Sequence, residues 1–188
     1  FRAQFTLSAL DLETELIAMT DRYTEELFDT TTRLGGSMLV NQASRLVMDP
    51  ERFPDDDDEP MSKKGMGVVY THTSDGRKLR DERFGSEQRE ELMIRLFYPY
   101  RDAIETLVTD SLKRFSKCLI IDAHSFPSKP LRYEDPDLQR PDICFGYDEY
   151  HAPKELLKEL KEVCADQGYK TADNSPFAGS YVPQKYYE

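Results

Sequence analysis

The chain has 188 residues, with 36 acidic and 25 basic side chains and a net charge of −11 at pH 7. This length suits one domain with a continuous core, and the acidic surface disfavours nucleic acids and anionic membranes. No stretch approaches the roughly 20 apolar residues that cross a bilayer, and the first residues lack a signal-peptide pattern. We therefore expect one domain spanning residues 1–188, in a cytoplasmic protein that binds neither nucleic acid nor membrane.

The first third of the chain has one clear helical pattern followed by irregular sequence. Apolar side chains at helical spacing predict a helix over residues 9–30, either continuous or broken near residues 19–20. Residues 37–49 are predicted to form one or two extended segments. Residues 50–67 include the acidic run 55–58, prolines and glycines, and are predicted to form a long surface loop.

The middle of the chain alternates strand-like and helical patterns. Residues 67–73 (GVVYTHT) have the composition of a β-strand. Residues 86–115 have helical spacing, and Pro99 inside them predicts two helices or one kinked helix. Residues 118–121 (CLII) are predicted to form a strand buried on both faces of a sheet.

The last third is predicted to contain a long loop over residues 125–153, a helix between Pro153 and Gly168, and an edge strand at residues 169–171. A loop of that length in a compact domain usually shapes a functional site. Strands that alternate with helices predict an α/β fold on a mixed sheet.

The three cysteines, Cys118, Cys144 and Cys164, are widely spaced and form no CxxC pair. An odd number in apolar or helical surroundings predicts reduced, buried thiols. A reactive thiol or a metal ligand is the alternative.

Polar side chains follow the predicted strand at residues 118–121. Asp122 and His124 leave the same face of an extended chain, and ligands gather at the carboxyl ends of strands in open α/β sheets. The carboxylate would orient the imidazole, or both would reach one ligand. The alternative is a capped strand end with a hydrogen-bonded histidine. No GxSxG, GxGxxG, P-loop or HExxH motif occurs, so those chemistries lack their markers.

Three other side chains have two interpretations each. Arg45 lies four residues before Asp49, which predicts either a buried salt bridge or a substrate clamp. Arg140 is a candidate fork for a substrate carboxylate or a member of a surface ion pair with a nearby aspartate. Asn174 belongs to a tight loop that either contacts a ligand or is a plain turn.

Seven segments in order along the chain resemble the N-formylglutamate amidohydrolase family. They are MTDRYTEELFD (19–29), ASRLVMDPERFPDD (43–56), GMGVVYTHTSDG (65–76), FYPYRDAI (97–104), LIIDAHSF (119–126), RPDICFG (140–146) and DNSPFAGSY (173–181). The resemblance implies a three-layer α/β/α sandwich on a mixed sheet, like that of zinc carboxypeptidases and aspartoacylases. It also implies an amidohydrolase-like catalytic domain that hydrolyses N-formyl-L-glutamate to formate and L-glutamate in histidine degradation.

The resemblance also implies roles for individual residues. His124 would be a ligand of Zn2+ or another divalent metal, and Asp21 the acidic ligand. Arg45 and Arg140 would bind the carboxylates of this small-molecule substrate, and Asn174 would hold its backbone end.

Two departures from the family pattern affect the site. The family's first metal-binding histidine, in a PHSG-like segment, and its catalytic glutamate would lie before Phe1 and beyond residue 188. With only two ligands named, residues 1–188 are expected to bind metal weakly. The family often has histidine where this chain has Arg101.

Two other functions stay open at this point. One is a carboxypeptidase-like peptidase of the same superfamily, and the other is a non-catalytic protein that binds carboxylates. The sequence does not indicate an oligomeric state.

Overall fold

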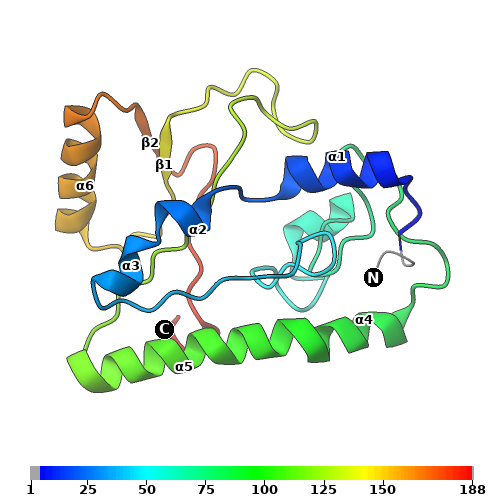
Figure 1. Ribbon diagram of the computed structural model, residues 1–188, viewed down its shortest axis with the longest axis horizontal. Coiled ribbons are helices and arrows are strands. Elements are labelled where there is room, and N and C mark those ends of the chain that lie inside the picture. Colours follow the sequence, from blue (N-terminus) through cyan, green and yellow to red (C-terminus); the bar gives the residue numbers. More distant parts are fainter. Residues whose placement is uncertain (1–4, 188) are drawn as a thin grey trace. The chain divides into compact units, whose positions relative to one another are not determined.

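The computed structural model describes residues 5–187 and divides into two compact units. The first unit comprises Phe1–Phe126 and Pro183–Glu188, and the second comprises Pro127–Val182. Helices and a small parallel sheet confirm the predicted α/β class (Figure 1). The single domain expected over residues 1–188 stays a prediction. Within residues 5–187, no helix combines the length and apolarity that a membrane crossing requires.

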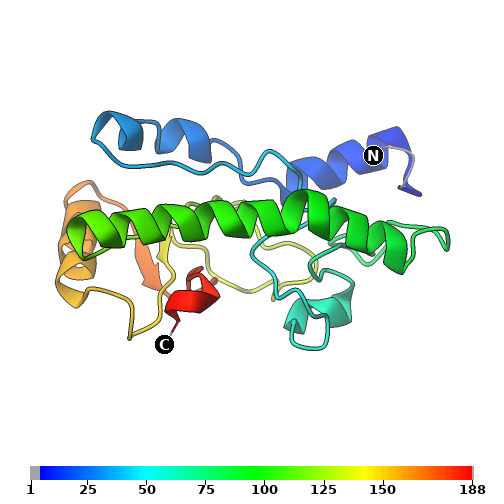
Figure 2. The same ribbon diagram turned by 90° about the horizontal axis from the view of Figure 1, so that it is seen from below.

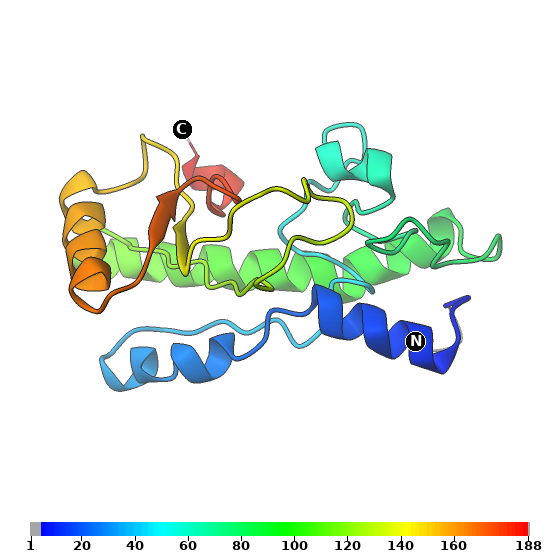
Figure 3. The same cartoon turned by 90° about the horizontal axis from the view of Figure 1, so that it is seen from above.

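The first unit begins with three short helices, drawn in blue in Figure 3. They are α1 (Ala9–Met19), α2 (Thr24–Leu27) and α3 (Thr30–Arg33). The Ser8 side chain caps α1 by accepting a hydrogen bond from the Asp11 backbone N–H at 3.1 Å. The helix ends where Thr20 turns to an extended conformation, so the predicted break near residues 19–20 is confirmed. Asp21 follows directly in the link to α2.

One long helical run forms the other side of the first unit, and Figure 2 shows it as an unbroken ribbon. It consists of α4 (Ser86–Leu92), the π-helical turn η3 (Met93–Phe97) and α5 (Tyr98–Phe115). Pro99 lies in the first turn of α5, and the wider π turn before it accommodates a residue that has no N–H to donate. The π turn therefore takes the place of the predicted separation into two helices.

The core of the first unit lies against this helical run. It is a cluster of six buried apolar side chains, Met48, Val68, Val69, Leu92, Met93 and Phe97. The predicted strand at residues 67–73 contributes two of them but forms only an isolated bridge, between His72 and Lys78. Its backbone is satisfied by loops instead, because the Val68 carbonyl accepts a hydrogen bond from the Asp49 N–H at 2.8 Å.

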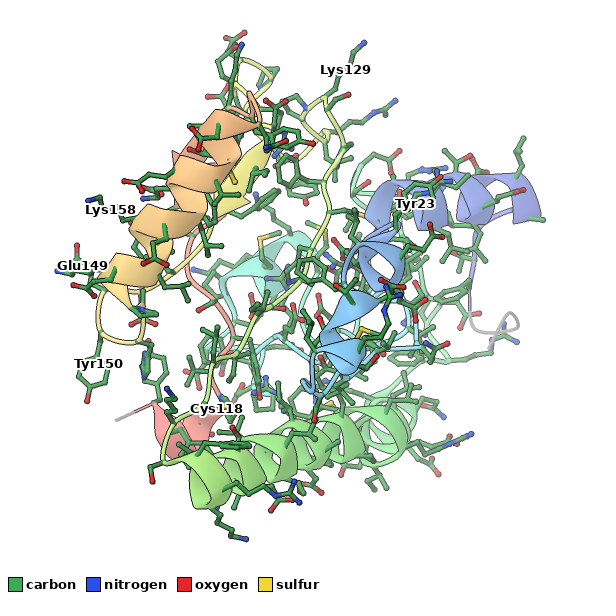
Figure 4. The ribbon with its side chains drawn as sticks, turned by 60° about the vertical axis from the view of Figure 1, so that its left-hand side comes forward. Tyr23, Cys118, Lys129, Glu149, Tyr150 and Lys158 are labelled. Atoms are coloured by element: carbon green, nitrogen blue, oxygen red, sulfur yellow. The ribbon has the colours of Figure 1, made fainter. Side chains whose placement is uncertain are left out.

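The predicted buried strand at residues 118–121 is wrong. The segment is extended, but within residues 5–187 no strand pairs with it, and Leu119 and Ile121 are 58% and 63% exposed. An apolar strand is buried only when neighbouring strands and helices cover it. Cys118, just after α5 in Figure 4, is exposed for the same reason, which corrects its predicted burial. Residues 37–49 likewise form irregular chain and a turn rather than strands.

The second unit is a β–α–β arrangement. Strands β1 (Ile143–Phe145) and β2 (Thr171–Asp173) pair in parallel, and α6 (Lys154–Asp166) forms the crossover between them. The predicted helix is confirmed, but β1 lies inside the predicted loop at residues 125–153, and β2 begins at the last residue of the predicted edge strand. Cys144 and Cys164 are half-buried, not core residues. Two 3-10 helices, η2 (Pro60–Lys64) and η4 (Gln184–Tyr186), belong to the first unit.

The exposure of Cys118 predicts the order in which the thiols react. An aromatic disulfide reagent should modify Cys118 first, and the half-buried Cys144 and Cys164 more slowly. The Cys118→Ser variant should lose the fast phase, whereas Cys164→Ser should retain it. A fast phase that survives in Cys118→Ser would contradict the exposed segment.

Candidate functional site

His124 lies at the centre of a cluster of three carboxylates in the first unit. Its Nδ1 is 3.5 Å from an oxygen of Asp21. Its Nε2 is 3.1 Å from an oxygen of Asp122 and 3.2 Å from one of Glu51. Each of the four side chains is 20–40% exposed. The imidazole therefore has carboxylates on both of its nitrogens at a partly open site.

Three separate segments bring these side chains together. Asp21 follows the end of α1, and Glu51 belongs to the loop just after the buried Met48 and Asp49. Asp122 and His124 come from the extended segment that follows α5, two residues apart and on one face. The predicted pairing of Asp122 with His124 is confirmed, although the segment that carries them is not a strand.

Asp21 is held on both of its oxygens. One accepts a hydrogen bond from the Ser125 backbone N–H at 2.9 Å, and the other is paired with the Arg45 guanidinium. Burial raises the pKa of Asp21, but the hydrogen bond with His124 and the charge of Arg45 outweigh burial and lower it. Asp21 is therefore an ionised carboxylate that faces His124.

The charge of the cluster also acts on the imidazole. Hydrogen bonds with Asp122, Asp21 and Glu51 raise the pKa of His124 from 6.5 to about 12. Without a metal ion, a proton on His124 balances part of the negative charge of the three carboxylates. A metal ion on the ring would have to displace that proton.

A second polar network supports the loop that carries Glu51. Asp49 is buried and accepts a hydrogen bond from the Tyr70 hydroxyl at 3.3 Å. Arg52 lies 3.3 Å from Asp49 and 3.5 Å from the buried Glu59. Burial and the charge of Asp49 raise the pKa of Tyr70 to about 12, so its hydroxyl keeps its proton. These contacts fix both sides of Glu51 along the chain.

Arg101, the other departure from the family pattern, contacts the same loop from α5. Its Nε donates to the Pro50 carbonyl at 2.7 Å, and its Nη2 donates to the Arg52 carbonyl at 2.8 Å. The guanidinium also lies 4.9 Å from the centre of the Phe97 ring. Arg101 thus holds the backbone on either side of Glu51.

The predicted substrate-binding residues fall in different units. Arg45 is in the first unit and forms its ion pair with Asp21, which corrects the predicted salt bridge with Asp49. Arg140 is in the second unit, where its ion pair is with Glu134 at 2.5 Å and both side chains are buried. Its guanidinium lies 5.2 Å from the centre of the Phe177 ring. This buried partner is a glutamate, whereas the sequence offered a surface pair with an aspartate.

Asn174, also in the second unit, has a backbone role. Its φ is 50°, and its Oδ1 accepts hydrogen bonds from the backbone N–H groups of Tyr147 at 2.9 Å and Gly179 at 3.2 Å. The turn interpretation of Asn174 is confirmed, whereas its contact with a substrate stays a prediction.

One group in the first unit has the composition of a metal site. Glu51, Asp122 and His124 each offer a ligand atom, and these three atoms lie within 4.8 Å of one another. The family resemblance implies His124 and Asp21 as ligands, and neither it nor the sequence pattern pointed to Glu51. The only signal for Glu51 was its position in the DPER segment, beside the predicted clamp around Arg45 and Asp49.

Comparisons with known proteins place the chain in a family. The profile of the N-formylglutamate amidohydrolase family matches residues 2–188. The chain belongs to this family. It is 28% identical over 171 residues to an N-formylglutamate deformylase of Pseudomonas putida, and 29% identical over 178 residues to one of Pseudomonas aeruginosa. These alignments cover 89% and 93% of the chain, which spans 63% and 66% of the length of the two relatives.

A solved structure shares the fold of this family member. The crystal structure of an N-formylglutamate amidohydrolase from Ralstonia eutropha superposes with a TM-score of 0.81 at 19% identity. The match covers 94% of this chain and 68% of the other.

The carboxylates around His124 predict an imidazolium that persists to high pH. A histidine with a raised pKa stabilises the folded state fully below its usual pKa of 6.5, and this contribution is lost as the pH rises toward about 12. With a chelator present at pH 8, nitrogen-15 spectra should show His124 protonated, and Asp122→Asn should lower its pKa. A neutral imidazole at pH 8 would contradict the cluster.

Proposed function

We propose that this protein hydrolyses N-formyl-L-glutamate to formate and L-glutamate with the help of a divalent metal ion, best taken as zinc. The observation that carries the proposal is His124 of the LIIDAHSF segment, which lies among carboxylates in a chain that matches the family over residues 2–188. Two relatives, at 28% and 29% identity, bear the name of this activity.

The residues around His124 fit a divalent metal. An imidazole nitrogen and carboxylate oxygens are ligands that zinc accepts, and three such atoms already lie within 4.8 Å of one another. A zinc ion supplies a positive charge that polarises an amide carbonyl and lowers the pKa of a bound water. His124 and an acidic neighbour would hold it, and the family resemblance assigns that neighbour as Asp21.

The arginines would bind the two carboxylates of the substrate. N-formyl-L-glutamate is a dianion, and the protein carries a net charge of −11, so the substrate needs fixed cationic partners. Arg140 is held by Glu134 and lies over Phe177, which orients its guanidinium. Arg45 is oriented by Asp21. Asn174 would hold the backbone end of the substrate.

The finer parts of the proposal concern fold and setting. We take the fold to be a three-layer α/β/α sandwich of the zinc-carboxypeptidase type, which the fold shared with the Ralstonia eutropha enzyme supports. We place the protein in the cytoplasm, in histidine degradation, with a small molecule as its partner.

Metal content and formate release test the proposal together. We expect the purified protein to contain a divalent metal and to release formate from N-formyl-L-glutamate. The His124→Ala variant should lose both, because it removes the imidazole ligand. The matched control His72→Ala changes a histidine outside the cluster and should retain both. Metal without formate release would favour a peptidase, and carboxylate binding with neither metal nor turnover would favour a non-catalytic protein.

Substitution of Arg140 tests the assignment of the carboxylate fork. Lysine keeps the charge beside Glu134 but loses the planar pair of donors. Arg140→Lys should therefore raise KM roughly 30-fold, which corresponds to about 2 kcal/mol for a charged hydrogen bond, with little change in kcat. Arg114→Lys, at the exposed end of α5, serves as the control. An unchanged KM in Arg140→Lys would rule out this role.

A further inference from the structure

We infer that Glu51 is a ligand of the divalent cation, together with Asp122 and Nε2 of His124, and that Asp21 orients the imidazole from the opposite side. This inference rests on the metal dependence proposed above and changes the set of ligands. The acidic ligand becomes Glu51 in place of Asp21.

The two nitrogens of His124 face different groups. Nδ1 faces Asp21 at 3.5 Å, whereas Nε2 faces Asp122 at 3.1 Å and Glu51 at 3.2 Å. An imidazole that binds a metal through one nitrogen usually donates its other N–H to a carboxylate. A cation on the Nε2 side meets three donor groups, and Asp21 then accepts the Nδ1 proton.

The other contacts of Asp21 suit an orienting role. One of its oxygens accepts the Ser125 N–H at 2.9 Å and also faces Nδ1, and the other is paired with Arg45. Coordination of a metal by Asp21 would compete with both of these charge-assisted contacts. A carboxylate held in this way fixes the tautomer and the plane of the ring instead.

Arg101 and the Asp49 carboxylate hold Glu51 at this position. Arg101 donates to the carbonyls of the residues before and after Glu51, at 2.7 and 2.8 Å. The Glu51 backbone N–H donates to Asp49 Oδ1 at 3.2 Å. Three hydrogen bonds therefore restrict the backbone from which the carboxylate projects, and Arg101 is a positioning residue of the site.

The charges of the cluster call for a cation. With a neutral imidazole, Glu51 and Asp122 share the Nε2 side of the ring, whereas Asp21 and its partner Arg45 lie on the Nδ1 side. The facing oxygens of Glu51 and Asp122 lie within 4.8 Å of each other, so the two carboxylates repel unless a positive charge lies between them. A divalent ion between Glu51, Asp122 and Nε2 supplies that charge.

Metal titrations of the purified protein test this assignment. With three ligands in place of the two named from the sequence, we expect one equivalent of Zn2+ to bind rather than the weak binding expected there, with Glu51→Gln weakening binding more than about 100-fold. Asp21→Asn should weaken binding by roughly 10–100-fold, the range typical of residues that orient a ligand. Glu91→Gln, on the exposed face of α4, is the matched control and should bind as the wild type does.

Cobalt spectra separate a ligand from a structural residue. Glu51→Gln should change the visible spectrum of bound Co2+, because it replaces a carboxylate in the coordination sphere. Asp21→Asn and Arg101→Lys should keep the spectrum, and Arg101→Lys should bind more tightly than Arg101→Ala. If Glu51→Gln lowers the melting temperature, Glu51→Asp is the second variant, and it should retain part of the affinity.

The inference is overturned if Glu51→Gln binds Zn2+ and Co2+ as the wild type does, or if Asp21→Asn alone changes the spectrum. Formate release by the same proteins separates this outcome from failure of the proposed function. Metal binding that depends on Glu51, without formate release, leaves the ligand assignment intact and refutes the substrate. Formate release together with metal binding that does not depend on Glu51 supports the substrate and refutes the ligand assignment. A wild type that binds no metal refutes both the ligand assignment and the proposed metal dependence.

Discussion

The site depends on three carboxylates that surround one imidazole. Asp21, Glu51 and Asp122 come from separate segments, and each would repel the others without positive charge between them. Arg45 is paired with Asp21, and a proton on His124 or a bound cation would offset negative charge on the other side of the ring. The grouping of ligand atoms from Glu51, Asp122 and His124 within 4.8 Å of one another is therefore the feature on which the proposed metal site rests.

Over residues 5–187, polar contacts rather than strand pairing hold the loops around this cluster. Arg80 is buried and donates to the carbonyls of Tyr70 at 2.8 Å and of Leu46 and Val47 at 3.1 Å. Burial lowers the pKa of Arg80 to about 10, so the guanidinium remains charged at neutral pH. Arg80 thus holds the segment just after Arg45, as Arg101 holds the segment around Glu51. Each guanidinium thus satisfies buried or partly buried backbone carbonyls of these loops.

Local patterns in the sequence predicted the helices whose extent depends only on residues within the helix and at its ends. The end of α1 and the whole of α6 follow from apolar spacing and from the residues at their ends. The segment at residues 118–121 shows the limit, because its burial depends on partner strands that a local pattern does not contain. Among the site residues, Asp122 and His124 were found by spacing. Glu51 was missed because contacts between distant segments, including those of Arg101 from α5, position its loop beside His124.

The most direct test of the central claim is the position of the metal in a crystal of the protein grown with Zn2+. Anomalous diffraction at the zinc absorption edge should show one strong peak about 2 Å from Nε2 of His124, within bonding distance of Glu51 and Asp122. The Nδ1 proton of His124 should then point to Asp21. A peak bonded to Asp21 and Nδ1, or no peak beside His124, would contradict this account.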